Sequence, residues 1–103
     1  MRCRQREPIP EEVRRTADLL ERRWTLSILF ASFEGAERFN EYLAALGAVP
    51  PTTLAVRLTE LVAAGLLERR VLDMRPPGVE YRLTNRGKRF EPVLRELVRC
   101  ARH

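Results

Sequence analysis

The chain contains few of the residues on which catalysis and metal binding usually depend. Among its 103 residues there are one histidine and two cysteines. The histidine is His103, and Cys3 and Cys100 stand near opposite ends, so neither a metal-ligand cluster nor a nucleophile with a neighbouring base is indicated. We therefore expect no cofactor, no bound metal and no enzymatic activity.

Long apolar runs are absent as well. The segment after Met1 is charged and carries Pro8 and Pro10, and no later stretch stays apolar for long enough to span a bilayer. Two thiols are too few for a secreted disulfide scaffold. These features predict a single cytoplasmic domain that does not bind a membrane.

Positive charge is present and is concentrated towards the two ends of the chain. The net charge is +5, with residues 1–23 contributing +2, residues 24–66 contributing −2 and residues 67–103 contributing +5. A basic surface attracts polyanions by releasing counterions, and nucleic acid is the common partner. A basic surface that serves solubility alone is the alternative.

Helical periodicity predicts four helices in the first two thirds of the chain, at 11–24, 24–35, 36–47 and 51–64. The second is apolar around most of its circumference and ends at Gly35, and the fourth begins with Pro51, which suits a first turn, and ends at Gly65. The first, third and fourth helices each have one apolar stripe. In that order, the stripes are Val13, Ala17, Leu20 and Trp24; Phe39, Tyr42, Leu43 and Leu46; and Leu54, Leu58, Leu61 and Val62.

The period changes from helical to alternating after Gly65. One strand is expected to place Leu67, Arg69 and Val71 on one face, and a second to place Val79, Tyr81 and Leu83 on one face, opposite Glu80 and Arg82. The tip of this hairpin is Arg75–Gly78. Thr84 is then expected to cap a final helix from Asn85 to about Arg102, bent near Pro92.

This order of elements predicts a mainly α fold with a small β-hairpin, in the α+β class. Residues 1–10 are expected to form a flexible arm and residues 11–103 a winged helix-turn-helix domain, because "GAVP" joins the third and fourth helices through a short turn and the hairpin follows directly. In such a domain the fourth helix packs one stripe on the core and offers the other to base edges in the major groove.

The chain resembles the HxlR-type branch of the MarR-like winged-helix regulators from about Arg23 to its C-terminus. The matching segments are "RWTLSIL", "RFNEYL", "LAVRLTELVAAGLLERRV" and "PPGVEYRLTNRG". The resemblance implies a homodimeric bacterial transcriptional regulator that binds a pseudo-palindromic operator, with the first and last helices forming much of the dimer interface.

The last helix supports a dimer independently of the resemblance. Its apolar residues cover an arc of roughly 160°, which is too broad for the small core of one protomer. The equivalent surface of a second copy is the expected cover. The residues of this arc are Phe90, Val93, Leu94, Leu97, Val98, Cys100 and Ala101.

Four candidate DNA contacts lie at the start of the fourth helix, which begins with Pro51. Thr52 and Thr53 are suited to hydrogen bonds with phosphate, although both are also common helix-start residues. Val56 is suited to a thymine methyl group, with an ordinary exposed apolar side chain as the alternative.

Three arginines complete the set of candidate contacts. Arg57 matches an arginine of the family and is expected to reach guanine or phosphate, with a solvated helix flank as the alternative. Arg75 at the wing tip suits phosphate or the minor groove. Arg38 is expected to contact the DNA backbone, with a salt bridge to Glu34 or Glu41 as the alternative.

Redox sensing by cysteine is a separate hypothesis. Many relatives carry a Cys-Pro pair about fourteen residues before the tryptophan, and Pro10 stands at the corresponding position here. The neighbouring arginines of Cys3 favour its thiolate, and Cys100 lies on the apolar arc of the last helix. A redox switch formed by Cys3 and Cys100 is therefore one hypothesis, and a purely structural role for Cys100 is the alternative.

A different class of function also remains open. The winged helix would then be a protein–protein interaction module without DNA binding, and the face around Val56 would contact a protein partner. The sequence gives neither an operator, nor target genes, nor a small-molecule effector.

Overall fold

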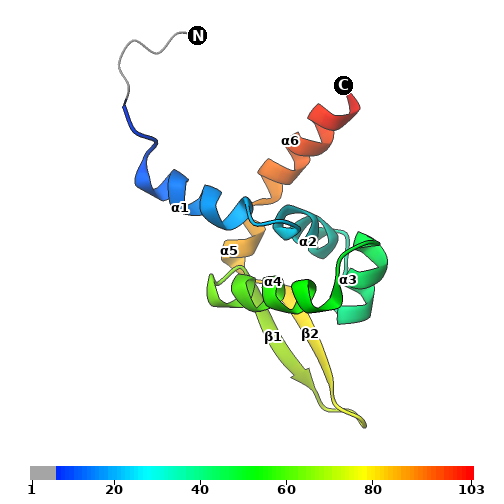
Figure 1. Ribbon diagram of the computed structural model, residues 1–103. Helices are drawn as coiled ribbons and strands as arrows, with labels where there is room; N and C mark the ends of the chain where they lie inside the picture. The colour runs from blue at the N-terminus through cyan, green and yellow to red at the C-terminus, as the bar shows by residue number, and fades with distance from the viewer. Residues whose placement is uncertain (1–6) are drawn as a thin grey trace.

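The computed structural model describes residues 7–103 of the chain. Cys3 and the first six residues of the expected arm lie outside the described residues, and residues 7–10 have no regular secondary structure. Within residues 7–103 the chain forms six helices and one two-stranded hairpin, made of β1 and β2 (Figure 1). The elements are α1 (Glu11–Leu20), α2 (Thr25–Phe33), α3 (Phe39–Leu46), α4 (Pro51–Ala63), β1 (Leu67–Leu72), β2 (Gly78–Leu83), α5 (Asn85–Lys88) and α6 (Glu91–Arg102).

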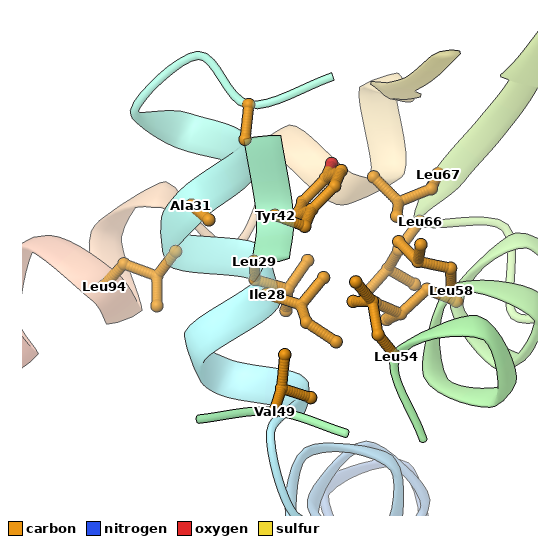
Figure 2. Close-up of a cluster of buried hydrophobic side chains, with 12 residues drawn as sticks. Ile28, Leu29, Ala31, Tyr42, Val49, Leu54, Leu58, Leu66, Leu67 and Leu94 are labelled. Carbon is orange, nitrogen blue, oxygen red and sulfur yellow. The ribbon is translucent and has the colours of Figure 1, made fainter. Parts of the chain in front are cut away.

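The core lies between α2, α3 and α4. Ile28 and Leu29 of α2 and Tyr42 of α3 have no exposed surface, and Leu54 and Leu58 of α4 complete the centre of the cluster (Figure 2). The expected stripe of α4 is confirmed, because Leu61 is also fully buried. Burying such side chains contributes about 1.5–3 kcal/mol each. The core therefore fixes which side of α4 faces outwards.

The end of α4 leads directly into the hairpin, as the sequence predicts. Gly65 has φ +81°, a left-handed conformation that suits glycine at the end of a helix. The strands are antiparallel, and Leu67 pairs with Leu83. In Figure 1 the hairpin extends from the body on the side away from α6.

The expected final helix is instead two helices, and the bend expected at Pro92 is wrong. Arg89 and Phe90 separate α5 from α6, and Pro92 lies in the first turn of α6. A first-turn amide has no partner within a helix, so proline fits there without loss of a hydrogen bond. The cap is confirmed, because the Thr84 hydroxyl accepts a hydrogen bond from the Gly87 amide at 3.0 Å.

Two other expectations need correction. The first helix ends at Leu20, and Trp24 is not on its stripe but precedes α2 with φ +81°. In the hairpin, Val71 is 63% exposed because β1 runs beyond the core, and Glu80 is buried although it is charged and lies on the face opposite Val79 and Tyr81. Between residues 7 and 103, no helix is long and apolar enough to cross a membrane.

Candidate nucleic-acid interface

The outward side of α4 carries side chains that are free of protein partners. Thr52 and Pro51 are exposed, Thr53 is half-buried and Val56 is 49% exposed. Within residues 7–103 the hydroxyl groups of Thr52 and Thr53 make no hydrogen bond to another side chain or to the backbone. Because the opposite stripe of α4 is anchored in the core, this outward face is presented rigidly at the surface.

Arg57 lies at the flank of α4, and its guanidinium group is held within the protomer. Nε donates to the backbone carbonyl of Arg23 at 2.9 Å, and Nη1 lies 3.3 Å from the Glu60 carboxylate. The side chain is only 15% exposed. A direct contact with DNA, as expected from the sequence, would require Arg57 to leave both partners.

The wing presents Arg75 at its tip. This residue is exposed, and no carboxylate of residues 7–103 forms an ion pair with it. Two apolar wing side chains, Val71 and Met74, are 63% and 44% exposed. The wing therefore combines a free positive charge with apolar surface.

Arg38 does not form the salt bridge that was its alternative assignment. Among the described residues, neither Glu34 nor Glu41 is an ion-pair partner of its guanidinium group. The group instead packs over the backbone of Gly78. If residue 78 carried a β-carbon, that atom would lie 3.0 Å from Cζ of Arg38. Arg38 thus connects the start of α3 to the start of β2, a contact that the sequence does not reveal.

The backbone before α3 is joined to the wing as well. The Tyr81 amide donates to the Glu37 carbonyl at 2.7 Å, and Arg38 forms an isolated bridge with Glu80. Arg82 Nε lies 3.3 Å from the Glu37 carboxylate and 3.0 Å from the Glu80 carboxylate. This added pairing explains the burial of Glu80 and orients the wing relative to α3.

Two ionisable groups of α3 are shifted by their surroundings. The backbone amides of Arg38 and Glu37 donate to the Glu41 carboxylate at 2.8 and 2.9 Å and lower its pKa below 4.5. Burial raises the pKa of the Tyr42 hydroxyl above 10.0, although its hydrogen bond with Ser32 at 2.7 Å opposes the shift. The Glu41 hydrogen bonds fix the backbone at the start of α3, and the Tyr42–Ser32 hydrogen bond joins α3 to α2.

An open groove of about 820 Å³ lies between α6 and the helices α2 and α3. Phe30 and Leu97 contribute to its lining, and they are 36% and 46% exposed. Only Leu94 of α6 is buried, and Cys100 is exposed with a free thiol. Figure 1 shows α6 projecting from the body. Of its apolar arc, Val93, Leu97, Cys100 and Ala101 are exposed in one protomer.

Comparison with known proteins agrees with this architecture. The chain is 37% identical to YvaP of Bacillus subtilis, described as an uncharacterized HTH-type transcriptional regulator, over 84% of this chain and 81% of YvaP. The reduced form of YodB from B. subtilis superposes with a TM-score of 0.80 at 30% identity, covering 91% of this chain and 92% of YodB. YodB is also known in a diamide-treated form.

The redox regulator HypR in its oxidised form superposes with a TM-score of 0.82 at 30% identity, over 88% of this chain and 94% of HypR. The model of the HxlR-like helix-turn-helix family matches residues 19–103. This match includes α2 to α6 and the whole hairpin. The chain belongs to the HxlR-like helix-turn-helix family and is a DNA-binding transcriptional regulator of the helix-turn-helix type.

Proposed function

We propose that two copies of the protein bind a pseudo-palindromic operator in the cytoplasm, with α4 of each copy in the major groove, and that the protein has no enzymatic activity. The observation that carries this proposal is the outward face of α4. Thr52 and Val56 are exposed there, next to a stripe that is fully buried. A helix that offers an uncommitted face beside a fixed one matches the geometry of a recognition helix.

The side chains of that face divide by their chemistry. Thr52 and Thr53 donate hydrogen bonds to phosphate oxygens beside the first turn of α4, which Pro51 begins. Val56 packs on a thymine methyl group, the apolar feature of the major groove. Base reading in this proposal therefore depends on Val56, while the threonines fix the register of the helix on the duplex.

The wing and the start of α3 contact the DNA backbone. Arg75 at the wing tip is free of carboxylate partners among residues 7–103 and reaches phosphate or the minor groove. Arg38 supplies a second positive charge beside the wing, where it crosses Gly78. These charges strengthen binding to any duplex, whereas α4 selects the sequence.

The second copy covers the apolar surface of α6. Val93 and Leu97 are 50% and 46% exposed, and Val13 of α1 is 51% exposed. The groove beside α6 has a volume of about 820 Å³, in which apolar side chains from α6 of the second copy can pack. Two-fold symmetry then spaces the two α4 helices about one turn of DNA apart, roughly 34 Å.

Control of binding by oxidation is the second part of the proposal. The thiol of Cys100 is exposed on α6, within the proposed dimer surface. The similar proteins HypR and YodB, one a redox regulator and the other crystallised after treatment with diamide, support the same kind of signal here. Diamide is expected to oxidise the thiols of Cys3 and Cys100 from two copies to a disulfide, which gives a linked species on non-reducing gels and changes operator binding, and Cys100→Ser is expected to abolish both effects.

A protein–protein module is the alternative, favoured by the exposed apolar side chains of Val56, Val71 and Met74. Selection of binding sites from random duplexes separates the two functions. We expect a two-fold symmetric site whose affinity falls steeply between about 50 and 200 mM salt, because phosphate contacts release counterions. Failure to enrich any sequence at either salt concentration contradicts DNA binding and favours the protein partner.

A further inference from the structure

A cluster of charged groups ties α4 to the corner between α1 and α2. Glu60 of α4 accepts from Nε of Arg22 at 3.0 Å through one oxygen and pairs with Nη2 of Arg22 at 3.0 Å through the other. The same carboxylate lies 3.3 Å from Arg57 Nη1, and Arg57 Nε donates to the Arg23 carbonyl at 2.9 Å. Two arginines, one carboxylate and one backbone carbonyl therefore join segments that are more than 30 residues apart.

The corner that these contacts hold has an unusual backbone. Trp24 adopts φ +81°, which places a bulky residue in the left-handed region, and such a conformation persists only where its surroundings enforce it. The guanidinium group of Arg23 stacks over the Trp24 ring at 5.1 Å from the centroid. The backbone between α1 and α2 therefore holds the Arg23 carbonyl in a fixed position facing α4.

Two of the three guanidinium nitrogens of Arg57, Nε and Nη1, have hydrogen-bond partners inside the protomer. Its side chain is 15% exposed, whereas that of Arg22 on the outer side of Glu60 is 49% exposed. A guanidinium group that is mostly buried beside a carboxylate is stabilised by that partner, and removing the partner leaves a charge that is poorly solvated. Leaving Glu60 and the Arg23 carbonyl to reach a base would incur this cost.

We infer that Arg57 is a positioning residue and that it acts with Glu60 to set how α4 is seated relative to α1. The inference rests on the proposed function, in which α4 reads the operator and α1 helps to form the dimer. Because α1 belongs to the dimer surface in that proposal, the Arg57–Glu60–Arg22 cluster also sets the separation of the two α4 helices. The cluster therefore determines the preferred spacing between half-sites.

Whether Glu60→Ala strengthens or weakens operator binding distinguishes a positioning role from a simple effect of charge. Removing a negative charge from a DNA-binding surface should strengthen binding to a polyanion. If Glu60 positions α4, Glu60→Ala instead weakens operator affinity by about tenfold, a change typical of broken side-chain networks. Glu60→Gln keeps an acceptor oxygen and is expected to lose less.

Glu68→Ala is the matched control, since Glu68 is exposed on β1 and forms no ion pair with any residue of the described part of the chain. It removes one negative charge without touching the cluster and is expected to leave affinity unchanged or to increase it. Thermal melting and stoichiometric titration with operator correct each affinity for the folded, active fraction. Loss of stability alone then does not count as loss of affinity.

Two further readouts belong specifically to positioning. Arg57→Ala should weaken binding to the selected operator and to its single-base variants by the same factor, with an unchanged slope of affinity against salt. It should also reduce discrimination against operators whose spacer is one base pair longer or shorter. The Arg57→Ala/Glu60→Ala double variant should be no weaker than the more affected single variant, because both break one cluster.

Three results would overturn the inference. They are unchanged or tighter binding by Glu60→Ala, loss of discrimination at one base pair in Arg57→Ala, and a salt slope lowered by about one in Arg57→Ala, which marks a lost phosphate contact. Absence of operator binding by the wild-type protein contradicts the proposed function itself. Binding by the wild type with both variants unchanged contradicts only the positioning role.

Discussion

The guanidinium group of Arg38 lies against the backbone of Gly78, so closely that a β-carbon at residue 78 would lie 3.0 Å from Cζ of Arg38 and 2.9 Å from the sulfur of Met74. Arg38 precedes α3 and Gly78 begins β2. The contact therefore adds to the Tyr81–Glu37 hydrogen bond and the Arg82–Glu37 ion pair in joining the helix-turn-helix to the wing. It places the proposed backbone-contacting arginine where its position depends on a glycine 40 residues later.

Gly78→Ala is expected to displace the flexible ends of the Arg38 and Met74 side chains, and therefore to move the Arg38 guanidinium group at a cost in stability below about 1 kcal/mol. Denaturation by urea measures the loss, and operator titration is expected to show weaker binding. The Arg38→Ala/Met74→Ala background provides the control, because both side chains that the new methyl group would meet are shortened there. If Gly78→Ala weakens operator binding as much in that background as in the wild type, Arg38 and Gly78 are not in the proposed contact.

Val56 is expected to recognise a thymine methyl group. Replacing thymidine by deoxyuridine at one position of the half-site should weaken wild-type binding by several-fold, since the apolar contact is lost. Val56→Ala should bind the two duplexes equally. Fluorescence titration with both duplexes makes the comparison, and equal wild-type affinity at every thymine position contradicts the role given to Val56.

The dimer is expected to depend on Leu97. Leu97→Gln removes an apolar side chain twice from a symmetric interface and should raise the dimer dissociation constant by at least about tenfold. Sedimentation equilibrium measures this constant. Arg95→Gln, an exposed change on the same helix, is the control and should leave the constant unchanged. Equal constants for the two variants would exclude Leu97 from the interface.

Stability is expected to fall in alkaline solution because of Tyr42. Burial raises the pKa of this hydroxyl above 10.0, so the folded state retains the proton that the unfolded state releases. The contribution is complete below about pH 10 and is lost as pH rises through the folded pKa. Tyr42→Phe should cost about 1 kcal/mol at neutral pH through the lost Ser32 hydrogen bond, and should flatten the alkaline decline.

Urea denaturation at several values between about pH 8 and pH 11 tests this pH dependence. An equally steep decline in Tyr42→Phe and in the wild type would assign the effect to other groups.

The sequence was sufficient for the parts of the fold that local periodicity determines. The stripe of Leu54, Leu58 and Leu61 identified the buried side of α4, and this also identified Thr52 and Val56 as outward-facing. The change of period after Gly65 located the hairpin. These predictions hold because each depends on the spacing of neighbours along one element.

Contacts between distant segments could not be predicted in this way. Glu80 alternates with apolar residues, and this pattern gave no sign that the bridge to Arg38 covers it. Arg57 Nε donates to the carbonyl of Arg23, 34 residues earlier in the chain, and this bond was not predicted. A backbone carbonyl leaves no signature in residue types, so the sequence carried no signal for this interaction.

The most direct test of the central claim is to record methyl and amide NMR spectra of the protein with and without its selected operator. The central claim is that a duplex occupies the outward face of α4 while the wing contacts the adjoining backbone. We predict the largest shifts at the Val56 methyl groups and at the amides of Thr52, Thr53 and Arg75. Operator binding that leaves these signals unchanged and perturbs other surfaces would contradict it.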